Sequence, residues 1–154
     1  MRVLFLALPM IALLSLSDVL AQEDAAKAEL VNMEGSWQLS RGEEGGNPLS
    51  EYIVKNLEVV IKGNRLVFKN IASLTDHAGT LTIKLDPSTT PKCIDLKVEA
   101  GSLKGTVFEG VYETKGDELK LCLLFASGAR NRPVEFETKA DSNRVLLVLK
   151  RQGR

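Results

Sequence analysis

Apolar and polar side chains alternate along most of the chain after residue 35, the pattern of strands with one buried face. The clearest case is residues 105–125, where two alternating runs meet at Gly116-Asp117, a two-residue turn typical of a β-hairpin. This register sets Glu113 opposite Lys120 on the outer face. It predicts the following inward side chains: Phe108, Tyr112, Leu119, Leu121, Leu123 and Phe125, with Gly110 leaving a gap opposite Leu123. It predicts the following outward ones: Val107, Glu109, Val111, Glu113, Lys120, Cys122 and Leu124.

A second hairpin covers residues 57–69 around the turn Gly63-Asn64, which pairs Ile61 with Leu66. Further alternating runs predict strands over residues 35–39, 80–85, 93–100, 134–137 and 145–151. About nine short strands, with turn signals every 8 to 15 residues or so, are typical of an all-β sandwich or barrel. The succession of hairpins favours an antiparallel up-and-down meander. We predict that it closes into a barrel, because closure removes exposed strand edges, with an open sandwich as the alternative.

The chain begins with the features of a secretory signal peptide: the basic Arg2, an apolar run over residues 3–16, and a small-residue cleavage site at Val19-Leu20-Ala21. Pro9 interrupts the run, which is shorter than the roughly 20 residues of a spanning helix. We therefore expect cleavage after Ala21, a secreted or periplasmic protein, and no membrane span after removal of the leader.

Local composition divides the rest of the chain. Residues 22–33 are rich in Ala, Glu and Lys, which predicts a short helix. The glycine-rich residues 41–48 are expected to form a flexible loop, and residues 49–56 fit either a helical turn or an edge segment. After residue 56 we expect almost no helix. The predicted division is a signal peptide over 1–21, an N-terminal helical segment over 22–34, and a single β-barrel domain over 35–154.

Short motifs in a fixed order run through nearly the whole chain after the leader. They are Gly35-x-Trp37, Leu85-Asp86-Pro87, Pro91-Lys92, Ile94-Asp95-Leu96, Gly110-Val111-Tyr112-Glu113, Gly116-Asp117-x-Leu119, Leu121-Cys122, Arg132-Pro133 with Phe136, and Leu149-x-Arg151. This set resembles an uncharacterised exported domain family expanded in Planctomycetes. The resemblance implies a compact, β-rich, lipocalin-like domain without an established activity. Gly35-x-Trp37 and the late Arg151 also resemble the lipocalins, which bind small apolar ligands inside a barrel.

Strand parity supports a contact between the two ends of the domain. In the last strand Val145, Leu147 and Leu149 share a face with Arg151, so an inward Val145 and Leu149 carry Arg151 inward as well. The same alternation along the first strand points the Trp37 side chain inward. Because a guanidinium stacks well on an indole, we predict that Arg151 lies over Trp37 and closes one end of the barrel; fraying of Arg151 into solvent is the alternative.

Charge and motifs indicate no catalysis. The chain carries 20 basic and 20 acidic residues, so it lacks the basic footprint of a nucleic-acid-binding protein. The single histidine, His77, is expected in a loop, pointing away from Asp76. The outer-face acids Asp95, Glu99, Glu109 and Glu113 are explained by pairing with neighbouring lysines. We predict no catalytic residue, no metal site and no cofactor.

The two cysteines are predicted to be free thiols despite the exported compartment. The register places Cys93 and Cys122 on the outer face, on either side of the strand that holds Val111. Two strand spacings amount to roughly 9 to 10 Å, beyond the ~7 Å Cα separation that a disulfide tolerates.

The predicted function is non-catalytic binding of a small apolar ligand in the barrel interior. The predicted ligand-binding residues are Trp37, Phe68, Phe108, Gly110, Tyr112, Leu121, Leu123 and Phe136. The alternative is a structural or protein-interaction domain with a filled interior and an exposed apolar patch around Val107, Val111 and Leu124. The protein partner is unknown.

Overall fold

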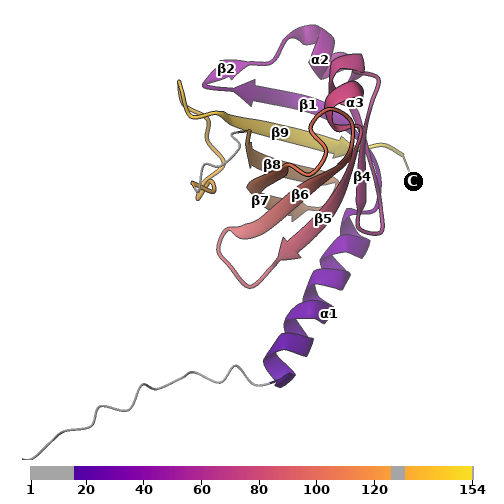
Figure 1. Ribbon diagram of the computed structural model, residues 1–154, viewed down its shortest axis with the longest axis vertical. Coiled ribbons are helices and arrows are strands. Elements are labelled where there is room, and N and C mark those ends of the chain that lie inside the picture. The colour runs from indigo at the N-terminus through magenta and orange to yellow at the C-terminus, as the bar shows by residue number, and fades with distance from the viewer. Residues whose placement is uncertain (1–15, 126–130, 154) are drawn as a thin grey trace, which may run out of the picture.

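The computed structural model describes residues 16–125 and 131–153, which form a closed antiparallel barrel of eight strands with one extra short strand (Figure 1). Around the ring the strands are β1 (Gly35–Glu44), β3 (Glu58–Lys62), β4 (Arg65–Lys69), β5 (Thr80–Asp86), β6 (Lys92–Ala100), β7 (Val107–Lys115), β8 (Glu118–Leu124) and β9 (Arg144–Arg151). β9 pairs back onto β1, with Trp37 opposite Arg151. The predicted closed up-and-down barrel is confirmed, and the open sandwich is wrong.

The alternating pattern builds the core because one face of every strand points into the ring. Both two-residue turns contain a glycine with a positive φ, +56° at Gly63 and +58° at Gly116, as tight hairpins require. The predicted registers are confirmed: Ile61 pairs with Leu66, and Glu113 with Lys120.

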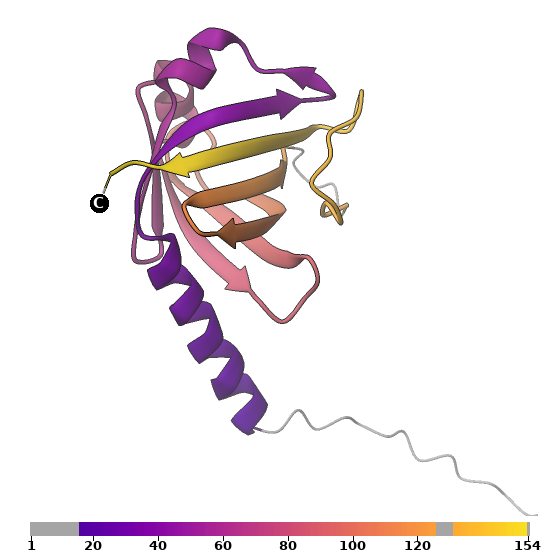
Figure 2. The ribbon, with the colours of Figure 1, turned by 180° about the vertical axis from the view of Figure 1, so that it is seen from behind.

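Helices lie at both ends of the barrel (Figures 1 and 2). α1 (Leu16–Met33) lies at one end and starts earlier than the predicted residue 22. α2 (Glu51–Asn56) and α3 (Ala72–Ala78) lie at the other end. In α2 the Ser50 hydroxyl accepts a hydrogen bond from the Ile53 amide at 3.3 Å. This side-chain cap stabilises the start of a helix, so of the two structures predicted for residues 49–56 the helical turn is the one that forms. The expectation of almost no helix after residue 56 missed α3.

Two further predictions about elements are wrong. Residues 41–48 are not a flexible loop, because β1 continues to Glu44 and turns at Gly45-Gly46 into the extra strand β2 (Asn47–Pro48). Residues 134–137 are not a strand. β8 and β9 pair directly with each other, so the ring offers these residues no free edge, and they cross the outside of the barrel.

The apolar run of the predicted signal peptide lies outside the described residues, except for Leu16. Among the described residues no helix combines the length and the apolar character needed to cross a membrane.

Candidate functional site

The barrel interior holds most of the residues predicted to bind a ligand. Their side chains are at most 4% exposed and belong to one continuous hydrophobic cluster: Trp37, Phe68, Phe108, Tyr112, Leu121 and Leu123. Phe125, also predicted inward, follows the end of β8; it stacks on Phe108 with a centroid separation of 4.3 Å and remains 36% exposed.

The predicted gap at Gly110 is filled from the neighbouring strand. A Cβ atom on Gly110 would lie 2.7 Å from Leu123 Cδ2 and 2.4 Å from the Cys122 carbonyl oxygen. Leu123 therefore occupies the space that the absent side chain leaves. Phe136, which the sequence analysis assigned to the interior, does not contribute to this contact.

Phe136 lies on the outside of the barrel, so its assignment to the interior is wrong. It packs against an outer-face cluster of Val111, Cys122 and Leu146. It belongs to residues 131–143, called here the covering segment, which leads into β9 (Figure 2) and packs on the outside of the barrel through Phe136.

The apolar patch predicted on the outer face is largely covered. Val111 is 1% exposed and Leu124 is 5% exposed, whereas Val107 remains 44% exposed. The prediction of a patch formed by all three residues is therefore wrong. Hairpin register identified the outward side chains correctly, but it could not show that an irregular segment distant in sequence packs over Val111.

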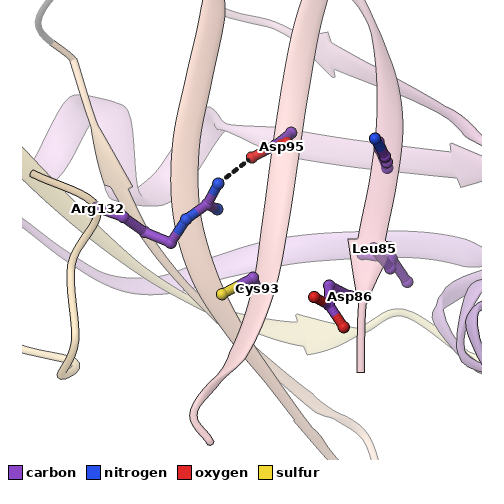
Figure 3. A pocket seen from close by; sticks show the side chains of 6 residues that line it. Leu85, Asp86, Cys93, Asp95 and Arg132 are labelled. Atoms are coloured by element: carbon purple, nitrogen blue, oxygen red, sulfur yellow. Dashed lines mark hydrogen bonds and ion pairs between the residues drawn. The ribbon is translucent and has the colours of Figure 1, made fainter. Parts of the chain in front are cut away.

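Arg132 fastens the covering segment to the sheet (Figure 3). Its Nη1 donates to the Ile94 carbonyl at 3.0 Å and to the Gly110 carbonyl at 2.9 Å. Its Nη2 donates to Asp95 Oδ1 at 2.7 Å, and Glu109 Oε1 lies 3.6 Å from the same nitrogen. Burial acts to lower the pKa of Arg132, but the hydrogen bond and the charge of Asp95 outweigh it, so the pKa is raised.

Arg132 is a structural residue that the sequence did not identify. The expected pairing with lysine holds for Glu113, which lies 3.2 Å from Lys120, whereas Asp95 and Glu109 bind Arg132 instead. In the sequence, the only indication of this structural role was that Arg132 belongs to the Arg132-Pro133 motif.

A small polar pocket of about 230 Å³ lies beside Arg132 (Figure 3). Its lining residues are Lys84, Leu85, Asp86, Cys93, Asp95 and Arg132. Hydrogen bonds from Ser88 lower the pKa of Asp86. Both Nη atoms of Arg132 are already engaged by Asp95 and by backbone carbonyls, so Arg132 serves the attachment of the covering segment.

The two thiols differ in their surroundings. Cys93 and Cys122 are both free, and both pair across strands with Val111, as the register predicted. The Cys93 sulfur accepts a hydrogen bond from Thr89 Oγ1 at 3.2 Å at the pocket wall, whereas Cys122 is fully buried and its burial raises its thiol pKa.

A larger groove of about 520 Å³ opens on the surface next to the covering segment. It is lined by the turn over residues 87–91, the first residue of β6, the end of β7 and residues 134–136. β6 begins at Lys92, which pairs with Tyr112, so β7 has no β6 partner beyond Tyr112. Val134 on the opposite wall is 72% exposed. The groove therefore combines an unpaired strand edge with accessible apolar side chains.

The predicted closing contact at the α1 end of the barrel is confirmed. The Arg151 guanidinium carbon lies 4.2 Å from the centroid of the Trp37 ring. Its Nη2 donates to the Asn32 carbonyl at 2.7 Å, its Nη1 donates to the Glu34 carbonyl, and its Nε lies 3.4 Å from Asp117 Oδ1. Trp37 Nε1 donates to the Met33 carbonyl at 2.9 Å. These contacts join α1, β1, β9 and the β7–β8 turn.

A second polar cluster, the Glu29 cluster, lies under α1 and consists of Glu29, Lys92 and Tyr112. Lys92 Nζ pairs with Glu29 Oε1 and lies 5.9 Å from the centroid of the Tyr112 ring. Glu29 Oε2 and the Tyr112 hydroxyl are buried and have no hydrogen-bond partner among the described residues. Burial, followed by the negative charge of Glu29, raises the pKa of Tyr112.

His77 forms a contact that the sequence did not predict. It lies in the last turn of α3 rather than in a loop, and its Nδ1 is 2.5 Å from the Ser102 hydroxyl. The amides of Ser102 and Leu103 donate to the carbonyls of Asp76 and His77. They are therefore not free to stabilise an oxyanion, and the pair is explained as a link between α3 and the β6–β7 turn.

Within residues 16–125 and 131–153, no three His, Cys, Asp or Glu side chains are grouped so as to hold a metal ion. No family model, no curated protein and no solved structure matches the chain. The resemblance to a planctomycete domain family therefore stays a prediction.

Proposed function

We propose that the protein is a non-catalytic interaction domain, with a filled barrel as scaffold and the groove beside residues 134–136 as its binding surface. The observation that carries the proposal is the continuous packing of the interior. Inward side chains from all eight wall strands belong to one buried cluster, and Leu123 occupies the space at Gly110. The interior thus supports the filled-barrel alternative better than ligand binding.

The groove has the chemistry of a protein-binding surface. Its exposed Val134 offers apolar area, and the end of β7 offers backbone groups that no strand pairs on the β6 side. The cluster of Val111, Cys122 and Leu146 fixes the position of the covering segment through Phe136, so this wall is preformed.

Selection from a displayed random-peptide library tests the groove. Peptides selected on the wild-type protein should bind the variant Val134→Asp at least tenfold more weakly, because a carboxylate would replace the most exposed apolar side chain of the groove. The matched control is Tyr52→Asp, which changes an exposed aromatic residue on α2 at the other end of the barrel. Equal binding to wild type and Val134→Asp would exclude the groove as the binding surface.

Titration with palmitate, followed by the fluorescence of the single tryptophan, tests the interior. Trp37 is buried in the barrel cluster, so a ligand entering the interior should change its emission. The proposal expects no saturable change. A saturable one-to-one change would establish the interior as a ligand site and overturn the filled barrel.

We further propose that the protein is exported and that its leader is cleaved after Ala21. Gln22 Nε2 donates to Asp86 Oδ1 at 3.0 Å, and Ala26, Leu30 and Met33 pack against the core. These contacts lie beyond the cleavage point, so removal of the leader would preserve them. The mass of the exported protein tests this proposal, with Gln22 expected as the first residue and an intact N-terminus contradicting it.

A further inference from the structure

α1 is attached to the barrel more firmly at one end than along its length. Met33 is the one buried residue among its 18 residues. Around Met33, the backbone carbonyls of residues 32–34 accept hydrogen bonds from Trp37 and Arg151. Toward the N-terminus, Ala26 and Leu30 are only partly buried, and Val31 is 67% exposed. Elements with few buried apolar contacts open at lower free energy than core strands.

The barrel wall is least continuous where α1 lies. β4 and β5 share three register pairs, whereas β5 and β6 share seven. The last residues of β5 therefore extend beyond β4, and α1 packs against β5. Gln22 reaches Asp86, the final residue of β5. α1 thus covers an end of the barrel that strand pairing leaves incomplete.

Electrostatic contact holds the middle of α1 in place. The Glu29 side chain is 18% exposed and pairs with Lys92 Nζ, which makes this ion pair better buried than the exposed Gln22–Asp86 hydrogen bond, the other polar contact between residues 22–31 and the strands. Docking also buries two polar atoms without hydrogen-bond partners, Glu29 Oε2 and the Tyr112 hydroxyl. Undocking of α1 would return both atoms to water. Docking therefore lowers the free energy of the protein by less than its contacts suggest.

We propose that residues 22–31 of α1 form a lid that opens and closes this end of the barrel, with the Glu29–Lys92 ion pair as its latch. Residues 32–34 stay fixed on Trp37 and Arg151 and serve as the attachment point. Opening uncovers Tyr112 and the apolar end of the core. The lid adjoins the groove, because Lys92 and Tyr112 belong to both, but its opening does not depend on the proposed function.

Amide hydrogen exchange of the full-length chain, followed by mass spectrometry, tests the lid. In the wild type, amides of residues 25–31 should exchange faster than those of β6 and β7, yet slower than an unstructured peptide. In Lys92→Gln their exchange should be faster by roughly tenfold or more, as expected when a partly buried charged hydrogen bond is lost. Exchange in β6 and β7 should stay unchanged.

Glu29→Gln should give the same result from the helix side of the latch. Lys120→Gln is the matched control, because it removes the ion pair with Glu113 on the outer face of β7 and β8. The proposal is overturned if α1 exchanges no faster in the two latch variants than in the control. It is also overturned if α1 in the wild type exchanges together with the strands, or as fast as an unstructured peptide.

Discussion

At the scale of single residues, Arg151 joins its own strand β9 to α1, to β1 and to the β7–β8 turn. Its guanidinium covers the Trp37 ring, binds two carbonyls at the end of α1, and lies beside Asp117 of the β7–β8 turn. The cation also complements the partial negative charge at a helix C-terminus. With a side chain only 12% exposed, Arg151 acts largely shielded from solvent.

Replacing Arg151 with Ala should lower the free energy of unfolding by about 2 to 4 kcal/mol, from the lost charged hydrogen bonds and the lost cation–π contact. Arg151→Lys should recover only part of this loss, because an ammonium cannot bind both carbonyls while lying flat on an indole. Urea denaturation measures both variants. Arg65→Ala, at an exposed position on β4, is the control, and an equal loss in it would contradict the role of Arg151.

Gly110 is constrained by space rather than by backbone angle. Gly110→Ala should destabilise the barrel by about 1 to 3 kcal/mol, because the new methyl group meets a backbone carbonyl that cannot move aside. Adding Leu123→Val to this variant removes the side-chain clash but keeps the carbonyl clash. Thermal unfolding should therefore show partial rescue at most, and a complete rescue would disprove the backbone contact.

At the scale of elements, the covering segment is held by side-chain contacts, among them the Arg132 cation and the packing of Phe136, instead of by strand pairing. Arg132 uses carbonyls of two paired residues, Ile94 and Gly110, together with the carboxylate of Asp95. Beneath the segment lies the cluster that contains Cys122. The reactivity of this thiol therefore reports whether the segment is in place.

In a Cys93→Ser background, Arg132→Ala should raise the rate of alkylation of Cys122 by iodoacetamide at least tenfold, because the buried thiol becomes accessible and loses the burial that raises its pKa. Lys139→Ala is the matched control, since Lys139 pairs with Glu135 and Glu137 within the same segment. Unchanged reactivity in Arg132→Ala would show that other contacts hold the segment.

Elements whose pattern is local were predictable from the sequence, whereas those fixed by distant contacts were not. The hairpins at Gly63 and Gly116 follow from turn chemistry and alternation, and both registers are confirmed. Residues 134–137 alternate in the same way, yet they form no strand because β9 already pairs with β8. The groove also escaped prediction, since its walls come from three separate segments of the chain, residues 87–92, 112–114 and 134–136.

At the scale of the whole molecule, the barrel encloses polar groups along with its apolar core. The hydroxyl of Tyr112 is the clearest example, because the residue is 1% exposed and its hydroxyl has no hydrogen-bond partner in the part of the chain that the structure describes. The alternation of side chains along the strand predicted correctly that Tyr112 points inward. Only the three-dimensional structure shows that α1 brings the Glu29 carboxylate next to it.

Stability should therefore fall in alkaline solution through Tyr112. Its pKa in the folded protein is raised above the value of about 10 in an unfolded chain, so folding favours the neutral form. This contribution is complete below about pH 10 and declines as the pH rises from there toward the folded-state pKa. Tyr112→Phe should weaken the decline. Near pH 7 it should leave stability unchanged or slightly raised, because the buried hydroxyl that it removes has no hydrogen-bond partner among the described residues.

Denaturation of both tyrosine variants between pH 7 and pH 11 measures the effect. Tyr52→Phe is the control, since Tyr52 is the only other tyrosine and is 64% exposed. An equally steep alkaline decline in wild type and Tyr112→Phe would assign the decline to other groups.

The pairing of β1 with β9 also governs how the protein must be made. Trp37 and Arg151, which face each other across the closing pair, are 114 positions apart, as 151 minus 37 gives. A growing chain therefore exposes the unpaired edges of β1 and β8 until its last strand has been synthesised. Such edges template aggregation, so ribosome-stalled or C-terminally truncated chains should depend most on chaperones.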